Sequence, residues 1–230
     1  MSKRRGKSDV IRAIVFDLDG TLIDSYPGIR ASLNYAIRFR ESRLCLRGLR
    51  KKIGPPISKM VNSLWPKLDQ KNYEKILQRF RRHYDREGCL RSRMYPGARK
   101  MLVGMKKTGK KAFLLTNKPA TATNRILHQL KIESFFVEVV CPDSVSPPLG
   151  HKKEGALLLR QKHRLLSGET LLVGDSQDDM VAAGAAGFQF GIALYGYGGL
   201  SRDPDRSYFL VLKSPRDFGK LARTMYKKNL

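Results

Sequence analysis

Short apolar runs alternate with helix-like stretches along most of this 230-residue chain. Several of the runs are apolar throughout, as expected for strands of a parallel sheet that is covered on both faces. We expect strands at residues 10–16, 111–115, 136–140, 170–173, 189–194 and 207–212. Helical spacing predicts helices at residues 97–108, 121–130, 153–164 and 178–186. The alternation predicts an α/β fold with a doubly wound, Rossmann-like parallel sheet.

Residues from about 25 to 94 follow a different pattern, with no strong strand candidate. Helices are expected there at residues 27–43, 56–64 and 70–86. We therefore predict a small helical domain, residues 25–94, inserted after the first strand of a core made of residues 1–24 and 95–230.

The charge of the chain is strongly positive, with 45 Lys and Arg against 20 Asp and Glu, a net charge of +25. The insertion carries about half of this excess. Such a balance favours anionic partners, which include phosphorylated metabolites, nucleic acid and an acidic membrane surface. A very soluble surface explains it equally well, because no nucleic-acid-binding motif accompanies the charge.

The three cysteines (Cys45, Cys89 and Cys141) lie far apart and form no CxxC pair. They predict neither a disulfide framework nor a zinc site, and free thiols favour the reducing cytoplasm. No apolar run approaches the roughly 20 residues of a membrane-spanning helix. The basic N-terminus followed by an apolar run resembles a signal peptide, but Arg12 interrupts the run and no cleavage site follows. We therefore expect a soluble, cytoplasmic protein.

Asp17 and Asp19 follow the first predicted strand in the segment Asp-Leu-Asp-Gly-Thr. Ligands of open α/β sheets bind beyond the carboxyl ends of the strands, so both carboxylates would lie at the active-site edge. They suit a divalent cation, which prefers oxygen ligands, or a nucleophile paired with a general acid/base. A solvated acidic turn is the alternative.

A second acidic cluster, Gly-Asp-Ser-Gln-Asp-Asp, follows the strand at 170–173. Asp175 and Asp179 are one helical turn apart and can face the same site, whereas Asp178 lies off that face. An ordinary helix N-terminus is the alternative here.

Two weaker signals accompany the acidic clusters. Thr116 and Asn117 follow the strand at 111–115, where a hydroxyl and free backbone N–H groups can hold a phosphate oxygen. Lys152 and Lys153 begin a helix after a proline-rich loop, and a lysine there can neutralise a phosphate. Either feature alone is common in turns and in a chain this basic.

Together and in this order, these segments resemble one family. The matching stretches are IVFDLDGTLIDS (14–25), YPGARKML (95–102), LLTNKP (114–119) and LLVGDSQDDMVAAGAAG (171–187). They are similar to the haloacid dehalogenase-like hydrolase superfamily, particularly its phosphoglycolate phosphatase-like branch. The resemblance covers nearly the whole chain, and the joint pattern is highly specific.

The resemblance implies a role for each matching residue. Asp17 corresponds to the nucleophile that becomes an aspartyl-phosphate, and Asp19 to the general acid/base. Thr116 corresponds to the hydroxyl that binds the transferring phosphoryl group, with Asn117 beside it. Asp17, Asp19 through its main-chain carbonyl, and Asp175 correspond to Mg²⁺ ligands, with Asp179 supporting the metal.

The phosphate-binding lysine is where the chain departs from the family pattern. The usual Lys-Pro-x-Pro is replaced by Lys152-Lys153-Glu154-Gly155, with both prolines missing. Lys152 is favoured by the alignment of the segment, and Lys153 remains an alternative.

The predicted insertion corresponds to the cap domain of the family. It lies between Asp19 and Thr116, which are 97 positions apart (116 − 19). Within it, the segment from Arg50 to Pro56 resembles the loop that faces the phosphate site, so Lys52 or Arg50 is a candidate for binding a carboxylate or second phosphate. A Gly-Pro turn with a solvated basic face is as good an explanation.

Two functions remain open from sequence. The first is an Mg²⁺-dependent phosphomonoesterase of a small phosphorylated metabolite such as phosphoglycolate; related nucleotidase, pyrophosphatase and mutase chemistries stay open. The acid at Asp19 favours phosphatases over the dehalogenases and ATPases of the superfamily. The second is a nucleic-acid or ribonucleoprotein-associated basic protein on the same scaffold, or a phosphatase of nucleotides or nucleic-acid ends. The oligomeric state is also open.

Overall fold

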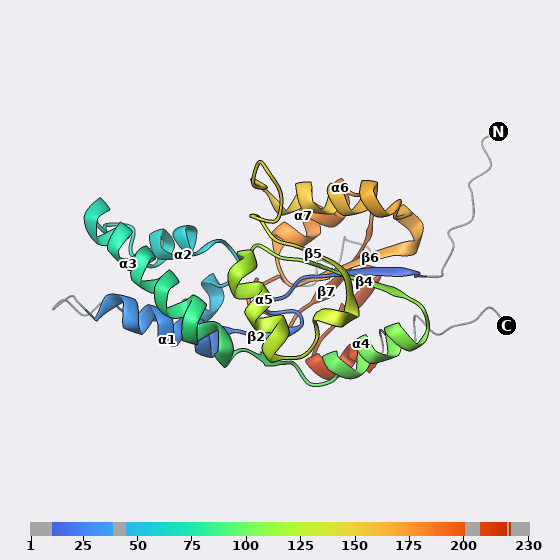
Figure 1. Ribbon diagram of the computed structural model, residues 1–230, viewed down its shortest axis with the longest axis horizontal. Coiled ribbons are helices and arrows are strands. Elements are labelled where there is room, and N and C mark those ends of the chain that lie inside the picture. The colour runs from blue at the N-terminus through green and yellow to red at the C-terminus, as the bar shows by residue number, and fades with distance from the viewer. Residues whose placement is uncertain (1–10, 39–44, 201–207, 220, 222–230) are drawn as a thin grey trace.

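A six-stranded parallel sheet forms the centre of the computed structural model, which describes residues 11–38, 45–200, 208–219 and 221 (Figure 1). Its strands lie in the order β5-β4-β1-β6-β7-β8, and every pair of neighbours is parallel. The strands are β1 (Ala13–Phe16), β4 (Lys111–Leu115), β5 (Phe136–Val140), β6 (Thr170–Gly174), β7 (Gln189–Ala193) and β8 (Leu210–Leu212).

Both faces of the sheet are covered because the central strands are apolar on both sides. All four residues of β1 are buried. Ile14 and Phe16 pack on one face with α4 (Ala98–Lys107) and α5 (Ala120–Gln129). Ala13 and Val15 pack on the other face with α6 (Lys152–His163) and α7 (Gln177–Ala185). The predicted doubly wound α/β fold is confirmed.

The predicted elements of the core agree with the structure to within a few residues. β4 and β5 have the predicted bounds, and the four helices differ by one residue at each end. β1 begins at Ala13, later than predicted, since residues 11 and 12 lie outside the ladder and residues 1–10 outside the described part. Residue 207, the predicted start of the last strand, also lies outside the described residues.

The strand order brings three loops to one edge of the sheet. Phe16 of β1 is paired with Leu114 of β4 on one side and with Val173 of β6 on the other. The residues that follow these strands therefore leave the sheet side by side at its carboxyl edge. This is the position where open α/β sheets bind ligands.

The helical segment between β1 and β4 lies beside the sheet, at the left in Figure 1. It contains α1 (Tyr26–Ile37), α2 (Ile57–Leu64) and α3 (Gln70–His83), with a 3-10 turn at Leu49–Lys52. A π-helical turn (Tyr84–Gly88) and a 3-10 turn (Cys89–Arg91) follow α3 directly. Further 3-10 turns lie at Glu133–Phe135, Ser167–Glu169 and Pro215–Asp217. The end of the helix predicted at 27–43 includes residues 39–44, which lie outside the described part.

Two short strands connect the helical segment to the sheet. β2 (Ile23–Asp24) pairs antiparallel with β3 (Arg93–Met94), beside both boundaries predicted for the inserted domain. Sequence analysis did not predict them, because two residues are too few to show an alternating pattern. The division into two domains stays a prediction.

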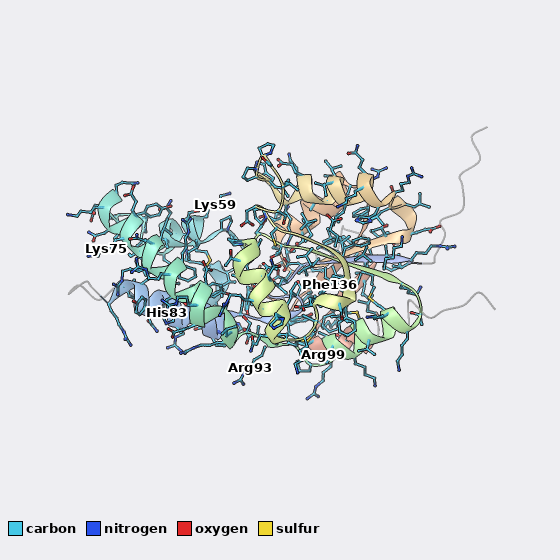
Figure 2. All side chains as sticks on the ribbon, viewed as in Figure 1. Lys59, Lys75, His83, Arg93, Arg99 and Phe136 are labelled. Carbon is cyan, nitrogen blue, oxygen red and sulfur yellow. The ribbon has the colours of Figure 1, made fainter. Side chains whose placement is uncertain are left out.

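The basic side chains of the helical segment are mostly exposed. Figure 2 labels the exposed Lys75 of α3 on the side away from the sheet, whereas the exposed Lys59 of α2 lies toward the core and lines a cavity with Asn117 and Lys152. Within the described residues, no helix is long and apolar enough to cross a membrane.

A close backbone contact fixes the π-helical turn against α1. A Cβ atom added to Gly28 would lie 2.0 Å from the carbonyl oxygen of Gly88, and one added to Gly88 would lie 2.1 Å from Oγ of Ser32. Only glycine at both positions permits this approach. The contact holds the turn that begins with Tyr84.

We predict opposite effects of the same substitution at two helical glycines. Gly28→Ala should lower the free energy of unfolding by about 1–3 kcal/mol, because the new methyl group meets backbone and cannot be accommodated. Gly184→Ala in α7 should raise it by about 0.5–1 kcal/mol, because nothing lies within 4 Å and alanine favours helix. Urea denaturation measures both; equal effects would contradict the packing described.

Candidate active site

Asp17 and Asp19 lie in the turn that follows β1. The side chain of Asp17 is buried, and Gly20 completes the turn with a φ of 84°. A Cβ atom at Gly20 would lie 2.2 Å from Oδ2 of Asp175, so a side chain there is excluded by both backbone strain and space. The turn thus brings the first acidic segment against the second.

Lys152 joins the two acidic segments. Its Nζ atom lies 2.5 Å from Oδ1 of Asp17 and 2.6 Å from Oδ1 of Asp179, and all three side chains are buried. Lys152 is the first residue of α6, whereas Lys153 is exposed. Of the two candidate lysines, the structure places Lys152 at the carboxylates.

Gly155 explains how α6 approaches the sheet closely enough for this contact. A Cβ atom there would lie 2.5 Å from Cδ1 of Leu115 and 3.1 Å from Cγ1 of Val140. The residue that replaces the second proline of the family pattern therefore has a packing role of its own.

Asp175 is held by the loop that follows β7. Its Oδ2 atom accepts hydrogen bonds from the backbone N–H groups of Tyr197, at 2.5 Å, and Gly198, at 3.1 Å. Cβ atoms at Gly196 and Gly198 would lie 2.2 and 2.3 Å from Asp175. Sequence analysis missed this loop, although the glycine-rich segment Gly196–Gly199 after a strand was a signal for it.

Asp179 closes the cluster from the first turn of α7. Its Oδ2 atom accepts hydrogen bonds from the backbone N–H and the hydroxyl of Ser176 in a capping box. Gly174 leaves room for it, because a Cβ atom there would lie 2.2 Å from Cγ of Asp179. Oxygen atoms of Asp17, Asp175 and Asp179 lie within 4.8 Å of one another.

The buried cluster shifts the proton affinities of its members. Burial, followed by the charges of Asp179 and Asp175, raises the pKa of Asp17, against the lowering effect of Lys152. Burial and the charge of Asp179 raise the pKa of Asp175 to about 7. Burial alone would lower the pKa of Lys152, but Asp17 and Asp179 raise it overall. The cluster holds three carboxyl groups against one ammonium, so both burial and mutual repulsion oppose ionisation of all three, and their hard oxygen donors fit Mg²⁺.

Thr116 and Asn117 follow β4 beside this cluster. Thr116 is buried, and its Oγ1 atom accepts a hydrogen bond from the backbone N–H of Lys118, which leaves the hydroxyl hydrogen available to donate. The amide of Asn117 donates to Oδ2 of the exposed Asp178 at 3.1 Å. Its side-chain N–H is thus engaged with α7.

Lys118 is a residue of the site to which sequence analysis gave no role. Its buried Nζ atom lies 3.0 Å from Oδ2 of Asp19 and donates to the hydroxyl of Tyr84 at 2.7 Å. Tyr84 begins the π-helical turn that the glycine contact holds against α1. Lys118 therefore connects Asp19 to the helical segment. The sequence signal was the lysine of Thr-Asn-Lys.

Lys52 and Arg50, the two basic residues predicted to bind the substrate, lie near the loop that follows β7, where Lys52 lines a cavity with Ser176 and Gly198. Their role stays a prediction. The Lys52 ammonium donates to the hydroxyl of Ser63, one of the contacts within the helical segment. Arg50 stacks over the rings of Tyr26 and Tyr197, 5.4 and 5.1 Å from their centroids. Neither lines the cavity that Asp19 lines.

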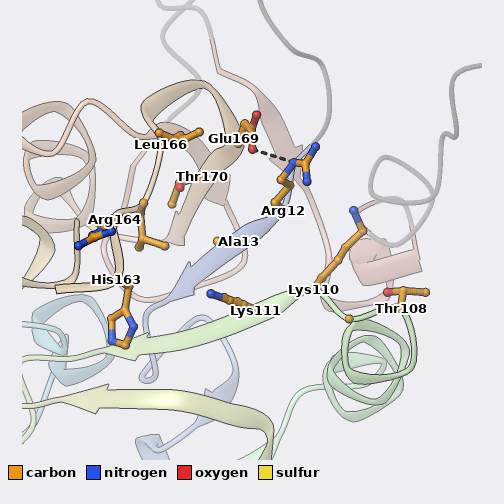
Figure 3. A pocket seen from close by; sticks show the side chains of 12 residues that line it. Arg12, Ala13, Thr108, Lys110, Lys111, His163, Arg164, Leu166, Glu169 and Thr170 are labelled. Carbon is orange, nitrogen blue, oxygen red and sulfur yellow. Dashed lines mark ion pairs between the residues drawn. The ribbon is translucent and has the colours of Figure 1, made fainter. Parts of the chain in front are cut away.

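Another cavity, of about 550 Å³ and lined mainly by basic side chains among its charged groups, lies at the opposite edge of the sheet (Figure 3). It includes Ala13, Lys111 and Thr170, the first residues of β1, β4 and β6. Arg12 at its rim is paired with Glu169 at 2.8 Å. Because the acidic cluster lies beyond the carboxyl ends of the same strands, this cavity is separate from the candidate active site.

The fold and the site together define a Rossmann-like α/β protein whose catalytic edge carries a buried carboxylate–lysine cluster. The family model of the haloacid dehalogenase-like hydrolases matches residues 14–193. The chain belongs to this family, as the sequence resemblance predicted.

Similar proteins agree with this assignment. The chain is 32% identical over 197 residues to a phosphoglycolate phosphatase of Photobacterium profundum, covering 81% of this chain and 85% of the relative. It is 31% identical over 198 residues to a phosphoglycolate phosphatase of Aliivibrio fischeri, with coverages of 81% and 86%. A solved structure described as a predicted phosphoglycolate phosphatase from Haemophilus somnus superimposes with a TM-score of 0.79 at 27% identity, covering 92% of this chain and 97% of that one.

The pKa of Asp175 predicts a pH dependence of stability when no divalent cation is present. Its folded-state pKa, about 7, is above the value of about 4 in the unfolded chain. The folded state therefore binds more protons, and its stability falls as the pH rises from about 4 to 7, by a few kcal/mol. Thermal unfolding in EDTA between pH 4 and pH 8 measures this loss.

Asp175→Asn is the matched control, because its amide oxygen can still accept the loop hydrogen bonds. The variant should lose less stability over this pH range than the wild type. Addition of Mg²⁺ should raise the melting temperature of the wild type most at high pH. Parallel stability curves for the two proteins in EDTA would contradict the predicted shift.

Proposed function

We propose that this protein is an Mg²⁺-dependent phosphomonoesterase that acts through an aspartyl-phosphate on Asp17. The observation that carries the proposal is the buried contact of 2.5 Å between the Lys152 ammonium and Asp17, within a cluster that also holds Asp175. A nucleophilic carboxylate beside a fixed cation and a site for a second cation suits attack on a phosphate dianion.

In the first step, an oxygen of Asp17 attacks phosphorus, and the bond from phosphorus to the alcohol oxygen breaks. Lys152 balances charge on the equatorial phosphate oxygens, and the Thr116 hydroxyl donates to one of them. Phosphoryl transfer depends mainly on such positioning and neutralisation. Asp19 donates its proton to the departing alkoxide.

In the second step, a water molecule attacks the phosphorus of the aspartyl-phosphate. Asp19, now a carboxylate, accepts a proton from that water, and the bond from phosphorus to Asp17 breaks to release phosphate. Oδ1 of Asp19 is buried and has no hydrogen-bond partner among the described residues, which supports this role. Oδ2 faces Lys118, which fixes the orientation of the carboxylate.

Asp17, the main-chain carbonyl of Asp19, and Asp175 are the residues that we propose to hold Mg²⁺. When bound, the metal would neutralise phosphate charge during the transfer. Both oxygens of Asp179 are engaged, with Lys152 and Ser176, so we assign Asp179 the task of positioning the lysine and supporting the metal site.

The substrate is proposed to be a small phosphorylated metabolite, with phosphoglycolate as the reference compound because relatives carry that name. The comparisons do not favour the nucleic-acid alternative. A cytoplasmic location also stays a prediction.

The proposed chemistry predicts that Asp17→Asn abolishes turnover, by at least about 1,000-fold in kcat, because an amide cannot form the aspartyl-phosphate. Phosphate release from phosphoglycolate, sugar phosphates, nucleotides, pyrophosphate and a 3′-phosphorylated oligonucleotide would be measured with Mg²⁺ and with EDTA. Circular dichroism checks folding. Normal turnover by the folded variant would refute the mechanism, and no release by the wild type from any compound would refute the proposed function.

Lys152 and Lys153 provide a matched pair of variants. Lys152→Met should lower kcat by about 100-fold or more, because a buried cation next to the nucleophile is lost. Lys153→Met should change kcat by less than about twofold, because this lysine is exposed. Steady-state kinetics on one substrate compares the kcat values of the two variants. Similar losses of kcat would show that the reaction does not depend on the contact between Lys152 and Asp17.

A further inference from the structure

The alcohol part of a substrate has to lie on the Asp19 side of the phosphate, because a general acid must reach the leaving oxygen within hydrogen-bond distance. Asp19 lines a cavity of about 400 Å³ between the helical segment and the core. The cavities that include Lys52 or Lys153 do not include Asp19. The leaving group therefore belongs in the first cavity, a step that rests on the proposed function.

The walls of this cavity, here called the Asp19 cavity, are mainly apolar. α1, α2 and α3 contribute the buried side chains of Ile29, Met60 and Phe80, and α5 contributes Ala122. Four prolines complete the lining, at positions 55, 56, 119 and 142. Such walls gain free energy by removing apolar substrate surface from water.

The charges that line the Asp19 cavity balance one another. They are two cations, Lys118 and Arg81, and two carboxylates, Asp19 and Asp85. Lys118 is already paired with Asp19 and bonded to Tyr84, and Arg81 lies one helical turn before Asp85. Among the described residues of this lining, the charges balance while Asp19 is ionised; when Asp19 carries the proton that the first step requires, the excess positive charge lies on Lys118, whose ammonium is already bonded to the Tyr84 hydroxyl.

The volume of the cavity also exceeds what a two-carbon acid requires. It lies within the range of about 300–1,000 Å³ that is common for clefts holding ligands much larger than glycolate. A substrate that fills it would carry a ring or an equivalent branched body.

We propose that the preferred substrates are phosphate monoesters whose alcohol carries an uncharged, apolar body of at least the size of a phenyl ring. This body lies in the Asp19 cavity between α2, α3 and α5, while the phosphate faces Asp17 and Lys152.

Three phosphate esters test this proposal: ethyl phosphate, 2-phenylethyl phosphate and phosphoglycolate. The first two share a primary alkyl ester and differ by the phenyl ring. Calorimetric binding to the Asp17→Asn variant with Mg²⁺ measures affinity without turnover. 2-Phenylethyl phosphate should bind about tenfold or more tightly than ethyl phosphate, because the ring is removed from water. It should also bind more tightly than phosphoglycolate.

Two tryptophan substitutions in α2, each added to Asp17→Asn, locate the bound ring. Ser58 is half-buried and lines the Asp19 cavity, so Ser58→Trp should fill it and reduce the ratio between the two alkyl esters to about one. Asn62 is exposed and lines none of the cavities described above, so Asn62→Trp should leave the ratio unchanged. Circular dichroism verifies that both variants fold.

The outcomes separate this inference from the proposed function. Equal affinity for the alkyl esters, tighter binding of phosphoglycolate, absence of binding by all three, or an unchanged ratio in the Ser58→Trp variant would overturn the inference. Wild-type turnover of phosphoglycolate in preference to 2-phenylethyl phosphate would leave the phosphatase assignment intact and would also overturn it. Failure of the wild type to release phosphate, with the ring preference in binding intact, would count against the proposed chemistry alone.

Discussion

The burial of three carboxylates against one lysine is the interaction on which the rest of the structure depends. Removing charges from water is costly unless partners and hydrogen bonds compensate for it. Lys152 supplies the compensation to Asp17 and Asp179, and the backbone of the loop after β7 supplies it to Asp175. The compensation is incomplete, because burial and the neighbouring carboxylates still raise the pKa values of Asp17 and Asp175. Binding of a divalent cation to these carboxylates would therefore stabilise the folded state further.

Glycines, which have no chemistry of their own, make this density of charged groups possible. Gly20 and Gly174 allow the two acidic segments to approach, and Gly155 allows α6 to bring its first residue to them. Each of these glycines lies within or beside a segment that carries a functional side chain. The local sequence therefore encodes the space around the charges as well as the charges, which is why the motifs extend over several residues.

Most of the core was predictable from sequence because its signals are local. Buried parallel strands are continuous apolar runs, and a carboxylate after such a strand has a defined place in space. Lys152 could be placed near the acidic segments for the same reason, because its position at the start of α6 is local; its role in binding phosphate stays a prediction. The contacts of Lys118 with Asp19 and Tyr84 were not predictable, because they join residues 99 and 34 positions apart (118 − 19 and 118 − 84). The strands β2 and β3 were too short to leave a pattern, and the charge of Lys52 gave no information about where its side chain points.

The same distinction explains why the reaction class can be inferred more directly than the substrate. The phosphate is common to all substrates, and the residues proposed to bind it, Asp17, Thr116 and Lys152, follow or precede core elements at fixed positions. The alcohol contacts a surface assembled from three helices of the inserted segment and one of the core, where apolar residues such as Met60 and Phe80 have the same spacing as ordinary core residues. Such residues can be recognised as a binding surface only in the folded structure, where they line a cavity.

The abundant positive charge does not identify the substrate either. Arg50 stacks on aromatic rings and Lys52 donates to a serine hydroxyl, and neither lines the Asp19 cavity. Recognition of the alcohol is therefore a matter of shape and apolar surface, while recognition of the phosphate is a matter of charge.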